Sequence, residues 1–167
     1  MQNVVQLLSL ILAVITFGTG ATKSVVPKEI SADGTVVASL LAEGAQTYEC
    51  KAGSDGKLVW TFREPIATLI SDGTTVGRHY AGPVWESVDG SAITGKVVAS
   101  APGATPDDIA WLKLSVVSAR GDGVFSKVTT VQRIETHGGA VQGSCERTGT
   151  ALVAPYSATY VFVREGN

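Results

Sequence analysis

The residues best suited to chemistry are concentrated in one segment, 77–91, which reads GRHYAGPVWESVDGS. It holds a histidine, a tryptophan and two carboxylates around a Gly-Pro step, and such a step favours a reversal of the chain. A reversal at 81–84 would bring His79 and Trp85 together across neighbouring strands. We therefore predict a small-ligand site in which Trp85 is an apolar wall and His79 or Glu86 forms hydrogen bonds.

The same segment also fits a purely structural hairpin, in which Trp85 fills the core and His79 bonds a backbone carbonyl. A second polar feature is the pair Gln132 and Arg133, which lies within a threonine-rich strand. Such a pair either faces solvent or lines a concavity. We count Asp89, Gln132 and Arg133 with the ligand-binding candidates of the first segment.

Catalytic and metal-binding arrangements are less well supported. The two histidines, His79 and His137, could join one carboxylate in a metal site, but their spacing matches no metal motif. A triad of Ser91, His79 and Asp89 lacks the Gly-x-Ser-x-Gly elbow that exposes a nucleophile. We therefore favour a non-enzymatic protein with no metal and no cofactor. The alternative is an enzyme that uses His79 with a nearby carboxylate, metal-assisted in one version.

Short segments with alternating apolar and polar residues must position these side chains. In 58–63, for example, Leu58, Trp60 and Phe62 share one face, as in a half-buried strand. Further strands are predicted at 35–42, 46–50, 93–100, 110–116, 128–136 and 158–163.

Five Asp-Gly steps separate these segments, and Asp-Gly is a typical hairpin turn. A helix over 35–44 is the best helical alternative. We predict an all-β single domain, either an antiparallel β-sandwich or a partly closed β-barrel, with one disulfide.

The first charged residue of either sign is Lys23, and residues 4–17 are almost entirely apolar. Small residues follow at 18–21, as in a secretory signal peptide. We predict a signal peptide at 1–21 and one exported domain at 22–167, which is periplasmic or extracellular. A retained N-terminal anchor is the alternative; without it, no transmembrane span is expected.

The chain has two cysteines, Cys50 and Cys145. Because export leads to an oxidising compartment, we predict a disulfide between them; two buried free thiols are the alternative.

Composition excludes some classes of function. The 167 residues have a formal net charge of −2 and are 44% hydrophobic, which excludes intrinsic disorder. A pI near 5.6 and the lack of a Lys/Arg cluster argue against a nucleic-acid partner.

Several short motifs occur together in this chain. They are GAQTYEC at 44–50, GRHYAGPVWE at 77–86, DGS at 89–91, IAWL at 109–112, VTTVQR at 128–133, THGG at 136–139 and PYSATYVF at 155–162. In combination they resemble the family catalogued as domain of unknown function 3455, small exported proteins of bacteria and fungi, over about residues 39–163. The resemblance implies an exported single-domain β protein with no established activity, and so no catalytic residues. The residues that fall on its motifs include His79, Gly82, Pro83, Trp85, Asp89, Gly90, Gln132 and Arg133.

The sequence thus favours an exported, non-enzymatic module that binds a small molecule, a glycan or an envelope component. The alternatives are the enzyme described above and a structural envelope protein without a pocket.

Overall fold

A computed structural model describes residues 25–166; the predicted signal peptide lies outside these residues. The described chain has one short 3-10 helix followed by eight strands. The elements are η1 (Lys28–Ile30), β1 (Thr35–Ala52), β2 (Leu58–Ser71), β3 (Thr74–Tyr80), β4 (Val84–Ser87), β5 (Ala92–Ala101), β6 (Trp111–Arg120), β7 (Thr130–Gly138) and β8 (Ala151–Arg164).

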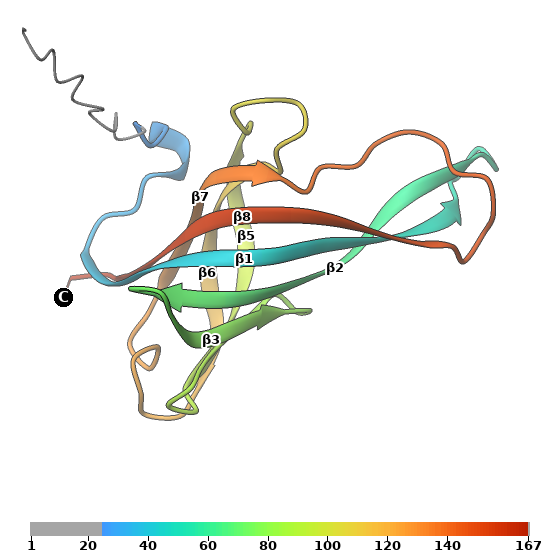
Figure 1. Cartoon of the computed structure of the whole chain (residues 1–167). Coiled ribbons are helices and arrows are strands. Elements are labelled where there is room, and N and C mark those ends of the chain that lie inside the picture. The colour runs from blue at the N-terminus through green and yellow to red at the C-terminus, as the bar shows by residue number, and fades with distance from the viewer. Residues whose placement is uncertain (1–24, 167) are drawn as a thin grey trace, which may run out of the picture.

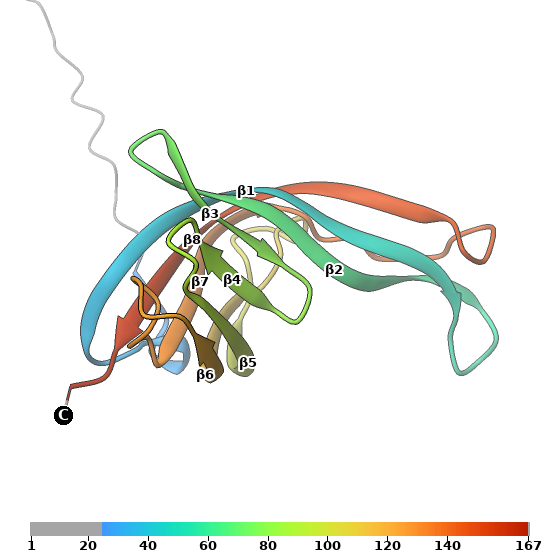
Figure 2. The same cartoon turned by 90° about the horizontal axis from the view of Figure 1, so that it is seen from below.

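Each strand pairs antiparallel with the next one along the chain, and β8 pairs back with β1, so that the sheet closes in a ring (Figures 1 and 2). The prediction of an all-β, antiparallel domain is confirmed. Four of the five Asp-Gly steps lie between consecutive strands. In three of these steps the glycine, Gly56, Gly73 or Gly90, has a positive φ that permits a tight turn. The segment 35–44, the helical alternative, belongs to β1 instead.

The interior of the ring is filled by every second side chain of the strands. In β8, for example, Tyr156, Ala158, Tyr160 and Phe162 are buried while the residues between them are more exposed or lie on the outer side. Phe162 stacks on Phe125, which comes from the β6–β7 connection. Alternation along the strand therefore produces the core, as the sequence pattern indicates.

The outer face of the ring is covered at one place by the N-terminal segment. Ile30 of η1 is completely buried and packs with Ile134 of β7 and Trp111 of β6. This cover explains why β7 has buried side chains on both of its faces.

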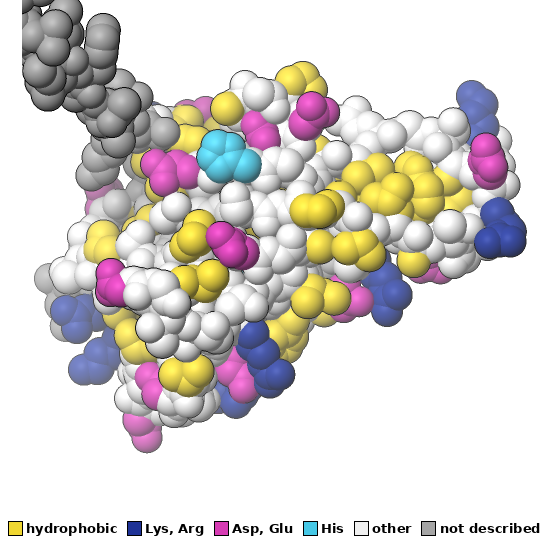
Figure 3. Space-filling view, viewed as in Figure 1, with side chains coloured by type: hydrophobic (Ala, Val, Ile, Leu, Met, Phe, Trp, Pro, Cys, Tyr) yellow, Lys and Arg dark blue, Asp and Glu magenta, His cyan; other side chains and the backbone are white. Residues whose placement is uncertain are grey.

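The strands β1, β2 and β8 extend beyond the rest of the ring as an arm (Figure 1). At the arm, Cys50 of β1 and Cys145 of the β7–β8 loop form a disulfide with a Cα–Cα distance of 5.8 Å, which confirms the predicted pairing. Apolar side chains are exposed on the arm, and acidic and basic side chains are mixed over the face seen in Figure 3. Within residues 25–166, no helix has the length and apolar character needed to cross a membrane.

Candidate functional site

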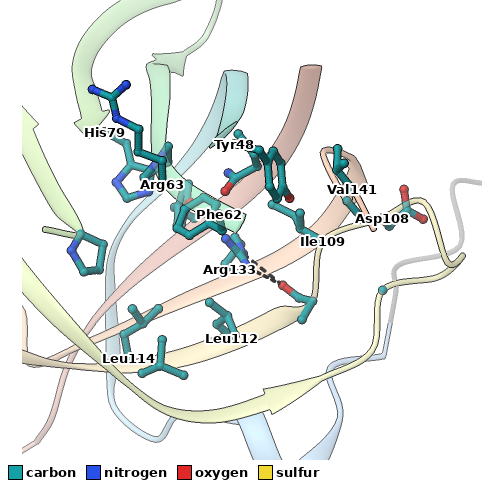
Figure 4. A pocket seen from close by; sticks show the side chains of 18 of the residues that line it. Tyr48, Phe62, Arg63, His79, Asp108, Ile109, Leu112, Leu114, Arg133 and Val141 are labelled. Carbon is teal, nitrogen blue, oxygen red and sulfur yellow. Dashed lines mark hydrogen bonds between the residues drawn. The ribbon is translucent and has the colours of Figure 1, made fainter. Parts of the chain in front are cut away.

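A cavity of about 660 Å³ lies inside the ring. It is bounded by the β3–β4 turn, the β5–β6 loop and the first residues of the β7–β8 loop (Figure 4). Most of its lining side chains are apolar, and a few polar groups reach it from β1, β3, β7 and β8. A concave, mainly apolar site with a few polar groups is typical of a small-molecule binding site.

His79 and Trp85 form one wall of this cavity. They are direct partners in the β3–β4 ladder, because residues 81–83 reverse the chain as the Gly-Pro step predicts. Their rings are stacked, with centroids 4.6 Å apart and planes 12° apart. Trp85 is 1% exposed, and the ring of Tyr160 packs edge-on against it. Trp85 is therefore a core residue, as the structural interpretation of this hairpin expects, and it also lines a concavity.

One hydrogen bond of the His79 ring defines its tautomer. Its Nδ1 lies 2.8 Å from the carbonyl oxygen of Val84, so Nδ1 carries a proton and donates it. Burial lowers the pKa of His79 to about 4, and the nearby charge of Arg133 also lowers it, while the Val84 carbonyl acts in the opposite direction. The imidazole is therefore neutral at neutral pH, and Nε2, which forms no hydrogen bond with the described residues, is a free acceptor.

The pKa of His79 predicts a loss of stability in mild acid. Between its ordinary pKa of 6.5 and the lowered value of about 4, the unfolded chain binds a proton that the folded chain does not. The free energy of unfolding should therefore fall by about 2 kcal/mol from about pH 7 to about pH 5. Urea unfolding at both pH values would measure this loss.

Two variants test whether His79 causes the effect. His79→Gln should be less stable at neutral pH and nearly independent of pH in this interval, whereas His137→Gln, which changes an exposed histidine, should keep the original slope. The carboxyl groups of Glu86, Asp89 and Asp108 have lowered pKa values, so their contributions are lost only in stronger acid. A pH slope that survives His79→Gln would contradict the assignment.

Arg133 is one of three charged residues that line the cavity, and it lies between the labelled side chains of Phe62, Ile109 and Leu112 in Figure 4. It pairs with Leu112 of β6 and Tyr160 of β8 in the ladders of β7, so its side chain points to the inside of the ring. Its Nε and Nη2 both donate to the carbonyl oxygen of Ala110, at 3.0 and 2.8 Å. Among the described residues, no carboxylate oxygen lies within 4.0 Å of this guanidinium.

Other polar groups of the lining are mostly bonded within the protein. The Tyr48 hydroxyl donates to the Gly139 carbonyl at 2.7 Å. The Asp108 carboxylate accepts hydrogen bonds from the backbone N–H of Gly138 and from Thr105, and these bonds lower the pKa of Asp108. Gln46 is 2% exposed, and its Nε2 has no hydrogen-bond partner within 3.5 Å among the described residues. The Gln46 amide lies near the Tyr156 hydroxyl. Burial raises the pKa of Tyr156, and the amide lowers it by a smaller amount.

Three of the predicted site residues, Glu86, Asp89 and Gln132, lie outside the cavity. Glu86 neighbours Trp85 in β4 and points to the opposite face, where it pairs with Arg78 and Arg120. The Tyr80 hydroxyl and Arg78 hold the pKa of Glu86 below its usual value. Glu86 therefore belongs to a surface ion-pair cluster.

Asp89 organises a turn. Its carboxylate accepts hydrogen bonds from the hydroxyl and backbone N–H of Ser91 and from the N–H of Val124, which lowers the pKa of Asp89 to about 2. A side chain at Gly123 would collide with this carboxylate.

Gln132 faces outward, where its Nε2 donates to the Ile30 carbonyl at 2.7 Å.

Several lining residues are absent from the sequence prediction, chiefly Gln46, Tyr48 and Tyr160. Gln46 and Tyr48 lie on the same face as the buried Cys50, because the spacing is two residues. A glutamine on the apolar face of a strand is the signal that could have identified this wall of the cavity.

His137, the second histidine of the metal-site alternative, is exposed on β7, whereas His79 is 3% exposed inside the ring. Within residues 25–166, no three His, Cys, Asp or Glu side chains gather in an arrangement that could hold a metal ion.

A family model described as "Protein of unknown function (DUF3455)" matches residues 31–164. No curated protein and no solved structure matches the chain.

Proposed function

The chain belongs to this family of unknown function, and we propose that it is an exported, non-enzymatic binding module that holds a small, mainly apolar molecule inside the ring. The observation that carries the proposal is the cavity of about 660 Å³ beside His79. Its volume is within the usual range of small-molecule sites, and its apolar lining favours an apolar molecule over a glycan.

The Cys50–Cys145 disulfide supports the exported location, because stable disulfides are characteristic of oxidising compartments. The predicted signal peptide at 1–21 supports it as well.

The position of the carboxylates favours binding over catalysis. An enzyme of the predicted kind needs a carboxylate beside His79, but Glu86 lies on the opposite face of its strand. Asp108 does line the cavity, but its carboxylate already accepts hydrogen bonds from the Gly138 N–H and the Thr105 hydroxyl. A purely structural protein would not need a cavity beside His79.

A bulky side chain in the cavity should abolish binding. We expect the neutral fluorescent probe N-phenylnaphthylamine to bind the unchanged protein saturably, with enhanced fluorescence. Leu112→Trp should weaken this binding at least tenfold, because the indole would fill part of the cavity. If only about 60 Å² of the probe's apolar surface is no longer buried, the binding free energy falls by about 1.5 kcal/mol.

Val117→Trp is the matched control, because Val117 lies on the same strand and is 58% exposed. The proposal is wrong if the unchanged protein gives no saturable signal, or if the two variants bind the probe equally well.

A further inference from the structure

Within residues 25–166, no carboxylate forms an ion pair with Arg133. The ion pairs of the described residues use the carboxylates of Glu49, Asp55, Glu64 and Glu86, and none of them involves Arg133. The guanidinium is partly buried and surrounded by apolar lining residues such as Leu112 and Ile109 (Figure 4). A cation in such surroundings is stabilised when an anion pairs with it.

The geometry of the guanidinium shows which of its edges is available. An arginine has five N–H donors in one plane. The Nε/Nη2 edge is occupied by the Ala110 carbonyl, whereas Nη1 forms no hydrogen bond within 3.5 Å among the described residues. The Tyr160 hydroxyl lies near the guanidinium, which lowers the pKa of Tyr160 against the larger, raising effect of burial. The remaining edge, formed by Nη1 and Nη2, presents two parallel donors, and this is the arrangement that a carboxylate binds with both of its oxygens.

The charges around the cavity favour an anion with a single negative charge. Arg63, the other arginine of the lining, is paired with Glu64 and has a side chain that is 59% exposed. The carboxylate of Asp108 lines the same cavity and would repel additional negative charge. His79 is neutral and adds no positive charge. Of the described residues, one unpaired cation, Arg133, therefore faces the cavity, which suits a carboxylate better than a phosphate dianion.

From these observations we infer that Arg133 binds the carboxylate of the ligand, so that the ligand is an apolar or aromatic monocarboxylate whose hydrocarbon part lies against Trp85, Leu112 and Leu114. This inference rests on the proposed binding function and specifies its ligand class. His79 Nε2 is available to accept a hydrogen bond from a hydroxyl or N–H group of the same ligand.

The test compares two probes that differ only in charge, naphthylacetate and naphthylacetamide, in competition with bound N-phenylnaphthylamine. The unchanged protein should bind the carboxylate about 10- to 100-fold more tightly than the amide, as expected for charge-assisted hydrogen bonds. Arg133→Met should remove this preference, and Arg133→Lys should retain part of it.

Arg63→Gln is the matched control, because it removes a positive charge from the same lining at an exposed position and should keep most of the preference. The inference is wrong if the unchanged protein binds the two probes equally well, or if folded Arg133→Met keeps the preference. If Arg133→Met does not fold, the inference is tested by the comparison of the two probes on the unchanged protein and on Arg63→Gln, both of which should prefer the carboxylate. Failure of N-phenylnaphthylamine itself to bind would instead overturn the proposed binding function, and the carboxylate inference with it.

Discussion

Trp85→Ala should lower the free energy of unfolding by about 3–5 kcal/mol, the usual cost of removing a large aromatic side chain from a core. Trp85 is 1% exposed and contacts three aromatic rings, those of His79, Tyr160 and Phe162. These rings come from β3 and β8, so the indole links strands on different parts of the ring. Domains of this size have a total stability of about 5–15 kcal/mol, and the variant should therefore unfold at a much lower urea concentration.

The close packing of Trp85 gives a sharper form of this prediction. A Cβ atom placed on Gly95 would lie 2.9 Å from Cζ3 of the indole and 3.3 Å from Leu114. Gly95→Ala should therefore destabilise the unchanged protein, and it should cost less in the Trp85→Ala background, where the indole is gone. We expect a coupling of about 1 kcal/mol in the double-mutant cycle, as for residues in direct contact.

Phe62→Ala is the control for both measurements. Phe62 is also aromatic and belongs to the same sheet, but it is 51% exposed, and its truncation should cost less than about 1 kcal/mol. If Trp85→Ala and Phe62→Ala have similar costs, or if Gly95→Ala is equally costly in both backgrounds, the indole does not have the role assigned to it here.

The second large effect is expected from the disulfide. The double variant Cys50→Ala/Cys145→Ala should lose about 2–5 kcal/mol of stability in urea unfolding, because the bridge closes a loop of nearly a hundred residues and so restricts the unfolded chain. Cys50 is completely buried, and alanine at this position avoids leaving a new polar group without a partner.

The disulfide also holds the β7–β8 loop against the arm. Beside the bridge, the N–H of Cys145 donates to the Leu58 carbonyl, and the N–H of Trp60 donates to the Gly143 carbonyl. The same loop contributes Ala140 and Val141 to the cavity. Loss of the bridge should therefore weaken the binding of N-phenylnaphthylamine as well as the fold.

Two controls accompany this experiment. The unchanged protein in a strong thiol reductant should lose as much stability as the double variant, and Val153→Ala, an exposed change on the same arm, should lose about 0.5 kcal/mol or less. A loss below about 1 kcal/mol in the double variant would show that the hydrogen bonds of the loop hold the arm without the bridge.

The sequence predicts those parts of the molecule that depend on neighbouring residues. The alternation of apolar and polar residues predicts strands, and the Asp-Gly steps predict most of the turns, because both patterns depend on residues only a few positions apart. The contact between His79 and Trp85 follows in the same way from the three residues, 81–83, that reverse the chain between β3 and β4. Two segments predicted separately, 35–42 and 46–50, are parts of the single strand β1, because the chain stays extended through Gly44, which pairs with Ala67 of β2 and Tyr156 of β8.

By itself the sequence thus determined the all-β fold, the cysteine pairing and one wall of the cavity. Only the tertiary structure decided that Gln132 and Arg133, which are adjacent in β7, have opposite roles. Gln132 lies on the outer face of the sheet, which η1 covers, and donates a hydrogen bond to the Ile30 carbonyl. Arg133 lies on the inner face of the sheet and lines the cavity. The tertiary structure likewise decided that Gln46 and Tyr160, from the first and last strands, line the same cavity as this arginine. The physical reason is the closure of the ring between β1 and β8, which brings together residues more than a hundred positions apart and leaves no local signal in the sequence.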